Sequence, residues 1–131
     1  MEYRLELVLL PVTDIDRAKA FYTDQCGFHL DVDTSPTEQF RVVQLTPPGS
    51  HCSISFGKGL VDTAPGSVRG LHLVVADIEQ AHAELTARGL AISPIRHFAD
   101  GAWQAGPDPQ RRTYHSFADF SDPDGNSWVL Q

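Results

Sequence analysis

The sequence is poor in two features that would have pointed to particular classes of protein. Its 131 residues include only two cysteines, Cys26 and Cys52, which are too few for a disulfide framework and favour free thiols in a reducing compartment. It has no apolar run near the roughly 18 residues that a membrane span needs, and the acidic start Met1-Glu2 does not resemble a signal peptide. We therefore expect a cytoplasmic protein with no membrane partner.

Basic residues are also scarce. Ten Lys and Arg stand against 17 Asp and Glu, which gives a net charge of −7. A surface that follows nucleic-acid phosphates needs clustered Lys and Arg, whereas Arg111-Arg112 is the only adjacent basic pair. We predict no nucleic-acid partner. The length and the 41% apolar fraction fit one globular domain that buries its core without disulfides or structural metal.

The chain contains an internal repeat. Residues 7–20 and 70–83 align with a shift of 63 and share the pattern Val-x-Asp-Ile-acidic-x-Ala-x-Ala. The period is too long for a solenoid and only two copies fit. We interpret them as two similar halves of a single domain spanning 1–131, with a first module at 1–56, a linker at 57–68 and a second module at 69–131.

Each half is predicted to be β-α-β-β-β. Asp14 and Asp77 are candidate helix N-caps, and Gln80, three residues after Asp77, resembles a capping box. Gly27 and Gly89 stand where each helix would need a left-handed C-cap. After the apolar run that opens each half, strands are predicted at Phe28–Val32, Phe40–Leu45, Cys52–Phe56, Leu90–Ile95, Tyr114–Phe120 and Ser127–Leu130, with turns at 46–49 and 122–126.

A longer segment, His97–Arg112, is predicted to be an irregular loop. It carries Trp103 and several Gly and Pro residues. Long loops in compact domains are often functional or disordered, so this one is a candidate lid or dimer contact, with a plain solvated connection as the alternative.

Two motifs carry a family resemblance. The pattern Leu-x-Val-x-Asp-Ile-x-x-Ala-x-x-Phe-Tyr-x-x-x-x-Gly-Phe runs from Leu10 to Phe28, and Asp-Pro-Asp-Gly-Asn at 122–126 precedes an apolar strand. Together they resemble the vicinal oxygen chelate superfamily of glyoxalase I, bleomycin-resistance proteins, fosfomycin-resistance enzymes and extradiol dioxygenases. The resemblance implies an α+β fold in which two βαβββ modules form an open, cupped, mixed β-barrel around one cavity. It also implies a homodimer, in which modules can be exchanged between chains.

The resemblance also implies where a metal would bind. Active members use four ligands, usually His and Glu, on the first and last strand of each module. The corresponding positions here are Leu7, Ser53, Gly70 and Val129. Leu, Gly and Val offer no side-chain donor, and a neutral Ser hydroxyl is a poor ligand for a divalent metal. We predict that the usual metal site is absent and that no cofactor is bound.

The remaining cavity face is predicted to be an apolar pocket with a few polar groups, which is the usual make-up of a small-molecule site. Aromatic residues near its mouth could stack on a flat ligand, although core packing is favoured for Phe117 and Phe120. The candidate ligand-binding residues are Leu7, Leu9, Phe40, His51, Ser53, His72, Trp103, Tyr114 and Val129.

These features favour a metal-independent binding protein similar to the bleomycin-resistance branch, which would sequester an aromatic or antibiotic-like ligand in a dimer cleft. The alternative is a glyoxalase-like lyase or isomerase, or a dioxygenase. It would use a displaced metal site around His72 and His51, or metal-free acid–base chemistry. A third hypothesis is a paralogue that binds an ordinary metabolite. We favour a binding protein over an enzyme, because the motifs of the fold are present and the usual metal-ligand residues are missing.

Overall fold

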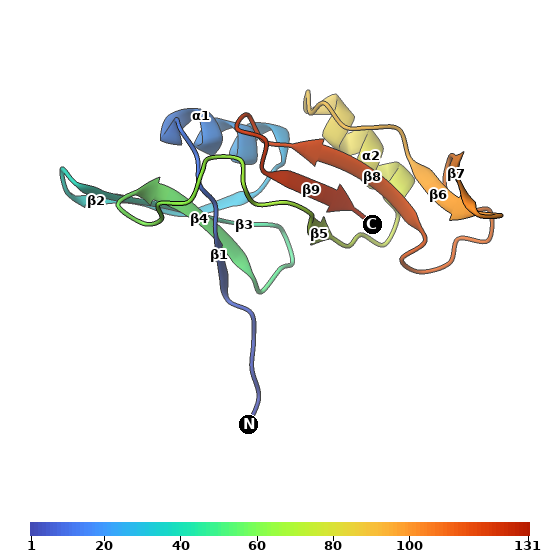
Figure 1. Cartoon of the computed structure of the whole chain (residues 1–131), viewed down its shortest axis with the longest axis horizontal. Coiled ribbons are helices and arrows are strands. Elements are labelled where there is room, and N and C mark those ends of the chain that lie inside the picture. Colours follow the sequence, from blue (N-terminus) through green and yellow to red (C-terminus); the bar gives the residue numbers. More distant parts are fainter. The chain divides into compact units, whose positions relative to one another are not determined.

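The computed structural model describes all residues from 1 to 131, and the chain divides into two compact units. Unit 1 comprises Met1–Val68 together with Asp122–Asn126, and unit 2 comprises Arg69–Ser121 together with Ser127–Gln131. Each unit contains one β-sheet and one α-helix (Figure 1), so the predicted α+β class is confirmed. None of the helices combines the length and the apolar character that crossing a membrane would require.

Unit 1 contains the β-α-β-β-β order predicted for the first half, with one added helical turn. Its elements are β1 (Leu7–Leu9), α1 (Ile15–Ala20), the π-helical turn η1 (Phe21–Gln25), β2 (His29–Thr37), β3 (Phe40–Thr46) and β4 (Ser53–Lys58). The sheet order is β1-β4-β3-β2. Strand β1 pairs parallel with β4, and the other neighbours are antiparallel.

The helical segment of unit 1 begins and ends where the sequence predicts. The Asp14 carboxylate accepts a hydrogen bond from the backbone N–H of Arg17 at 3.0 Å, as an N-cap should. Gly27, at φ 73°, provides the left-handed residue after η1. Between them the π-helical turn carries Phe21 and Tyr22, and both side chains are buried.

The core of unit 1 is built around the Tyr22 ring. It lies edge-on to Phe21 at 5.0 Å between ring centroids, stacks with Phe28 at 5.7 Å and lies 5.9 Å from Phe56. Phe56 projects from β4, which α1 contacts. The helical segment therefore covers the sheet face that carries Phe56.

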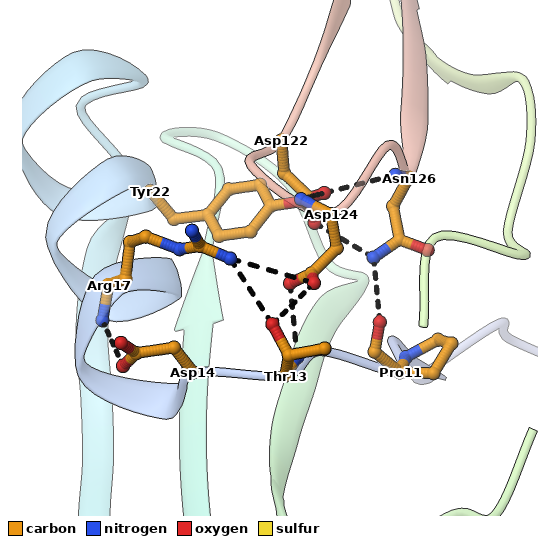
Figure 2. Close-up of polar contacts among 8 residues, drawn as sticks. All are labelled: Pro11, Thr13, Asp14, Arg17, Tyr22, Asp122, Asp124 and Asn126. Carbon is orange, nitrogen blue, oxygen red and sulfur yellow. Dashed lines mark hydrogen bonds and ion pairs between the residues drawn. The ribbon is translucent and has the colours of Figure 1, made fainter. Parts of the chain in front are cut away.

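The turn 122–126, near the end of the chain, belongs to unit 1 and is held by a buried polar network (Figure 2). The Tyr22 hydroxyl and the Asn126 side-chain amide both donate to Asp122 Oδ2 at 2.8 Å. The backbone N–H groups of Asp124 and Asn126 donate to Asp122 Oδ1 at 2.9 and 3.0 Å. The buried Asp122 carboxylate thus accepts four hydrogen bonds, as a buried charge requires.

The same turn is tied to the segment between β1 and α1. Asn126 Nδ2 donates to the Pro11 carbonyl at 2.9 Å, and the Thr13 hydroxyl donates to Asp124 Oδ1 at 2.7 Å (Figure 2). The backbone N–H of Val68 donates to Asn126 Oδ1 at 3.1 Å. The Asp-Pro-Asp-Gly-Asn motif therefore has a structural role: its side chains complete unit 1.

Unit 2 contains β5 (Leu71–Leu73), α2 (Ile78–Ala87), β6 (Arg96–Ala99), β7 (Ala102–Ala105), β8 (Ser116–Ser121) and β9 (Ser127–Leu130). The sheet order is β5-β9-β8-β6-β7. Asp77 caps α2 by accepting from the Gln80 backbone N–H at 3.1 Å. The Asp77 backbone N–H does not donate to the Gln80 side-chain oxygen, so the reciprocal bond of a capping box is not made; the Gln80 amide instead donates to Glu84. Gly89, at φ 91°, follows the helix as predicted.

Unit 2 has the order β-α-β-β-β-β rather than the predicted β-α-β-β-β, because two of its segments were predicted wrongly. Residues 90–95 form no strand; Leu90 is buried there, and Pro94, which lacks an N–H, interrupts the apolar run. Residues 97–112 are not one irregular loop, because β6 and β7 form a hairpin around Asp100-Gly101. These two residues have φ 55° and 75°, as a type I′ turn requires. The predicted strand at 114–120 begins only at Ser116.

Candidate ligand-binding faces

The sheet of unit 1 has one face turned away from α1, which we call the serine face. Residues directly opposite each other on paired strands lie on the same side of a sheet. The pairs Leu7–Ser53, Leu9–Ser55, Ser55–Gln44 and Gln44–Val32 thus define a face opposite to that of Phe56. The serine face is formed by Leu7, Leu9, Val32, Val42, Gln44, Thr46, Ser53 and Ser55.

Three predicted site residues, Leu7, Leu9 and Ser53, are brought together on the serine face. The two leucines are exposed, whereas Ser53 is only 8% exposed. The Ser53 hydroxyl lies 2.6 Å from the Thr46 hydroxyl, which in turn donates to the carboxylate of Asp31. The face therefore combines accessible apolar groups with a connected set of polar groups.

The other two predicted residues of unit 1 lie elsewhere. Phe40 lines a hollow of about 540 Å³ together with Ile15 and Arg41, and its lining includes neither leucine nor Ser53. His51 is exposed in the turn between β3 and β4. Phe40 is two residues before Val42 and so shares its side of β3, but it stands at the opposite end of that strand from Thr46 and Ser53. His51 lies on none of the strands of the serine face.

The sheet of unit 2 also has two different faces. Ala118, Phe120, Trp128 and Leu130 alternate along β8 and β9 and are all buried, and the ring of Phe120 stacks on that of Trp128 at 5.9 Å. The prediction that Phe120 packs in the core is therefore confirmed. The opposite side, which we call the aromatic face, is defined by the strand register and comprises His72, Arg96, Phe98, Trp103, Phe117, Asp119 and Val129.

Trp103 is the centre of the aromatic face. Its ring meets Phe98 edge-on at 5.4 Å and Phe117 edge-on at 5.6 Å. The guanidinium of Arg96 lies 4.7 Å from its centroid, in the range of a cation–π contact. The side chain nevertheless remains 54% exposed. Trp103 is thus an oriented aromatic surface held by neighbours on paired strands.

Arg96 is itself held in place by a carboxylate. Its Nη1 lies 2.7 Å from Asp119 Oδ2, so the guanidinium is fixed on one side by charge and on the other by the Trp103 ring. The predicted residues His72 and Val129 lie opposite each other at the β5–β9 end of the same face. The exposed His72 ring donates from Nδ1 to the Gly70 carbonyl at 2.6 Å.

Tyr114 lies in a different part of unit 2. It lines a hollow of about 610 Å³ together with Val74, Ile78 and Arg111, and none of the other predicted site residues lines it. The segment leading to Tyr114 is ordered by the buried Asp108, which accepts from Arg112 Nε at 2.9 Å and Nη2 at 3.0 Å. These hydrogen bonds hold the pKa of Asp108 well below its usual range.

The four positions that correspond to metal ligands do not fit a divalent metal. Leu7 faces Ser53 across the β1–β4 pairing, and Val129 faces His72 rather than Gly70 across the β5–β9 pairing. Three of the four offer no donor, and the Ser53 hydroxyl is engaged with Thr46. No group of three or more His, Cys, Asp or Glu side chains forms a cluster that could hold a metal ion.

Several polar residues of these faces were not predicted from the sequence, among them Asp31, Gln44, Thr46, Arg96 and Asp119. Arg96 and Asp119 are each two residues from an aromatic residue of the same face, Phe98 and Phe117, so period-two alternation would have placed them once the strands were known. Asp31 stands at an irregularity in the β2–β3 register between Leu30 and Val32, where alternation alone cannot fix a side chain's face.

The comparisons with known proteins agree with this architecture. Residues 4–130 match the model of the Glyoxalase/Bleomycin resistance protein/Dioxygenase superfamily, and the chain belongs to this family. The resemblance inferred from the motifs at 10–28 and 122–126 is thereby confirmed. No curated protein matches the chain significantly.

Solved structures of the family are similar over nearly the whole chain. TnmS3, an antibiotic binding protein from Streptomyces sp. CB03234, is 32% identical with a TM-score of 0.75, covering 99% of this chain and 95% of that one. A glyoxalase/bleomycin resistance protein from the same strain is 33% identical with a TM-score of 0.73, covering 98% and 99%. A superfamily member from Sphaerobacter thermophilus DSM 20745 is 26% identical with a TM-score of 0.73, covering 98% and 96%.

Proposed function

We propose that this chain binds a flat aromatic small molecule of the antibiotic type and sequesters it without chemical change and without a metal. The observation that carries the proposal is the oriented, half-exposed Trp103 with Phe98, Phe117 and Arg96 around it. Exposed aromatic clusters are typical of binding sites, because a rigid ring offers a large contact area at a small loss of conformational entropy.

Three further observations support this function. Leu7, Gly70 and Val129 have no side-chain atom that could bind a metal. These positions, at which active relatives hold a metal, therefore carry apolar side chains or none. The similar protein TnmS3 is an antibiotic binding protein, and the similarity extends over the whole fold. The net charge of −7 suits a neutral or cationic ligand, although salt screens charges at a distance. We include in the proposal a homodimer located in the cytoplasm.

Tryptophan fluorescence and thermal unfolding test the proposal together. The chain has two tryptophans, the exposed Trp103 and the buried Trp128, so a ligand on the aromatic face quenches mainly the first. Candidate ligands are flat aromatic antibiotics such as the anthracyclines doxorubicin and daunorubicin. At a hundred times its dissociation constant, a ligand that binds only the folded state stabilises the protein by about 2.7 kcal/mol.

Trp103→Ala is the decisive variant. We expect it to weaken binding about 10- to 100-fold, as the loss of a central aromatic contact does. Tyr3→Ala is the matched control, because Tyr3 is an exposed aromatic residue outside both faces and its loss should leave the affinity unchanged. Equal affinity of Trp103→Ala and the unaltered protein would overturn the proposal, as would a panel in which no compound raises the melting temperature. Conversion of a bound compound, detected by chromatography, would favour an enzyme instead.

A further inference from the structure

The serine face of unit 1 contains a chain of hydrogen bonds whose direction is fixed. The Thr46 hydroxyl donates to Asp31 Oδ2, and the Ser53 hydroxyl lies 2.6 Å from the oxygen of Thr46. A hydroxyl has one proton to give, and an ionised carboxylate has none. Because the Thr46 proton is directed to Asp31, the Ser53 proton must be directed to Thr46.

Two neighbouring side chains, Gln44 and Ser55, also donate hydrogen bonds to acceptors of the protein. The side-chain amide of Gln44 donates to Asp31 Oδ2 at 3.4 Å, and the Ser55 hydroxyl donates to the Val43 carbonyl at 3.0 Å. The hydroxyl protons of Thr46, Ser53 and Ser55 are therefore all used within the protein. What these hydroxyls can still offer a ligand is their lone pairs.

Asp31 adds a negatively charged acceptor to this arrangement. Both of its side-chain donors, Thr46 and the more distant Gln44, point to Oδ2. Its Oδ1 faces the ring of His29 at 3.7 Å, which is beyond hydrogen-bond distance. Oδ1 thus retains the capacity to accept a hydrogen bond beside the exposed apolar side chain of Val32.

We infer that the Asp31–Thr46–Ser53 chain makes the serine face a selector for aromatic ligands that carry a hydrogen-bond donor, such as a phenol. This inference rests on the proposed function and specifies the chemistry of its ligand. A phenol can donate a hydrogen bond to an acceptor on this face. The corresponding methyl ether places an acceptor oxygen against the acceptors of the protein, so neither forms a hydrogen bond. Ser53 is then a specificity-determining residue at a position where metal-binding relatives hold a ligand.

The test compares 2-naphthol with 2-methoxynaphthalene, in which a methyl group replaces the hydroxyl proton. Dissociation constants measured by calorimetry or by NMR titration should favour 2-naphthol about tenfold, the usual size of a hydrogen bond to a charged group. Asp31→Asn should reduce the ratio to below about threefold, because an amide can donate to Thr46 and reverse the chain. Asp62→Asn removes the same charge at an exposed position in the 57–68 segment and should preserve the tenfold ratio.

Thr46→Val provides a second variant of nearly the same shape. It removes the link between Ser53 and Asp31, so the Ser53 proton is free to turn toward the ligand and the ratio should fall again. If Asp31→Asn and Thr46→Val both keep the tenfold ratio, or if the unaltered protein binds both naphthalenes equally, the inference is wrong while the proposed function stands.

Trp103 belongs to unit 2, whereas Asp31, Thr46 and Ser53 belong to unit 1. Trp103→Ala should therefore leave the ratio of the two naphthalene dissociation constants unchanged. If neither naphthalene binds although an antibiotic does, the inference alone is overturned. If no aromatic compound of either set binds, the proposed function fails and the inference fails with it.

Discussion

Replacing Tyr22 by Phe removes one hydroxyl group from the centre of unit 1 and leaves the aromatic ring in place. The ring contacts with Phe21, Phe28 and Phe56 do not involve the hydroxyl, so packing is retained. The lost group is a donor at 2.8 Å to the carboxylate of Asp122. Both side chains are buried, with Tyr22 at 0% and Asp122 at 5% exposure, so water does not readily replace the missing donor.

The expected loss follows from the charge of the acceptor. Hydrogen bonds to charged groups contribute about 1.5–3 kcal/mol, and Asp122 keeps three of its four donors, so we expect about 2 kcal/mol from Tyr22→Phe. With a urea m-value of roughly 2 kcal/mol/M, the midpoint of unfolding should fall by about 1 M. Circular dichroism and the fluorescence of the buried Trp128 report the transition.

Tyr114→Phe is the matched control. Tyr114 is 59% exposed and its hydroxyl has no partner in the structure, so the change should stay within about 0.5 kcal/mol. Tyr22→Phe should also cost less in a protein that already carries Asp122→Asn, because a neutral acceptor forms the weaker bond. A loss below 0.5 kcal/mol for Tyr22→Phe, or an equal loss in both backgrounds, would refute the assignment of stability to this hydroxyl–carboxylate bond.

Two further predictions concern unfolding. Gly66→Ala should destabilise far more than Gly101→Ala in urea titrations: both residues have positive φ, but an added Cβ at Gly66 would lie 2.1 Å from the Asp124 carbonyl oxygen, whereas Gly101 has open space. Equal losses would contradict the close approach. Hydrogen bonds from Arg41, and then Lys19, lower the pKa of Asp33 to about 2. This lowered pKa should stabilise the protein above pH 4 by about 1 kcal/mol after solvent screening. The stabilisation should disappear as the pH falls from 4 to 2, so Asp33→Asn should be less stable at pH 7 and match the unaltered protein at pH 2.

Much of the fold could be predicted because its signals are local. Asp14 and Asp77 cap their helices, and Gly27 and Gly89 follow them in the left-handed conformation. The hairpin at 96–105 had a local signal too, since Asp-Gly is a strong type I′ turn. The apolar content of 90–95 predicted a strand, but a strand also needs a partner along its length. Ser93 meets Asp119 at a single point, through its backbone N–H and its hydroxyl.

The candidate faces were less predictable, because they depend on strand register. Alternation along single strands placed Leu7, Leu9 and Ser53 together, and likewise His72 and Val129. The surroundings of Trp103 required the pairings of β6 with β7 and β8, which bring Phe98 and Phe117 to it from distant positions in the sequence. The sequence favoured core packing for Phe117, whereas the structure places it on the aromatic face, half-buried against Trp103.

The position of residues 122–126 has a consequence for the synthesis of the chain. A ribosome delivers residues 1–68 first, yet the carboxylate that Tyr22 needs and the amide that caps the Pro11 carbonyl emerge only some fifty residues later. Until residues 122–126 have been synthesised, the Tyr22 hydroxyl and the Pro11 carbonyl lack these partners, so unit 1 can complete its fold only after residues 69–121 of unit 2 have been made.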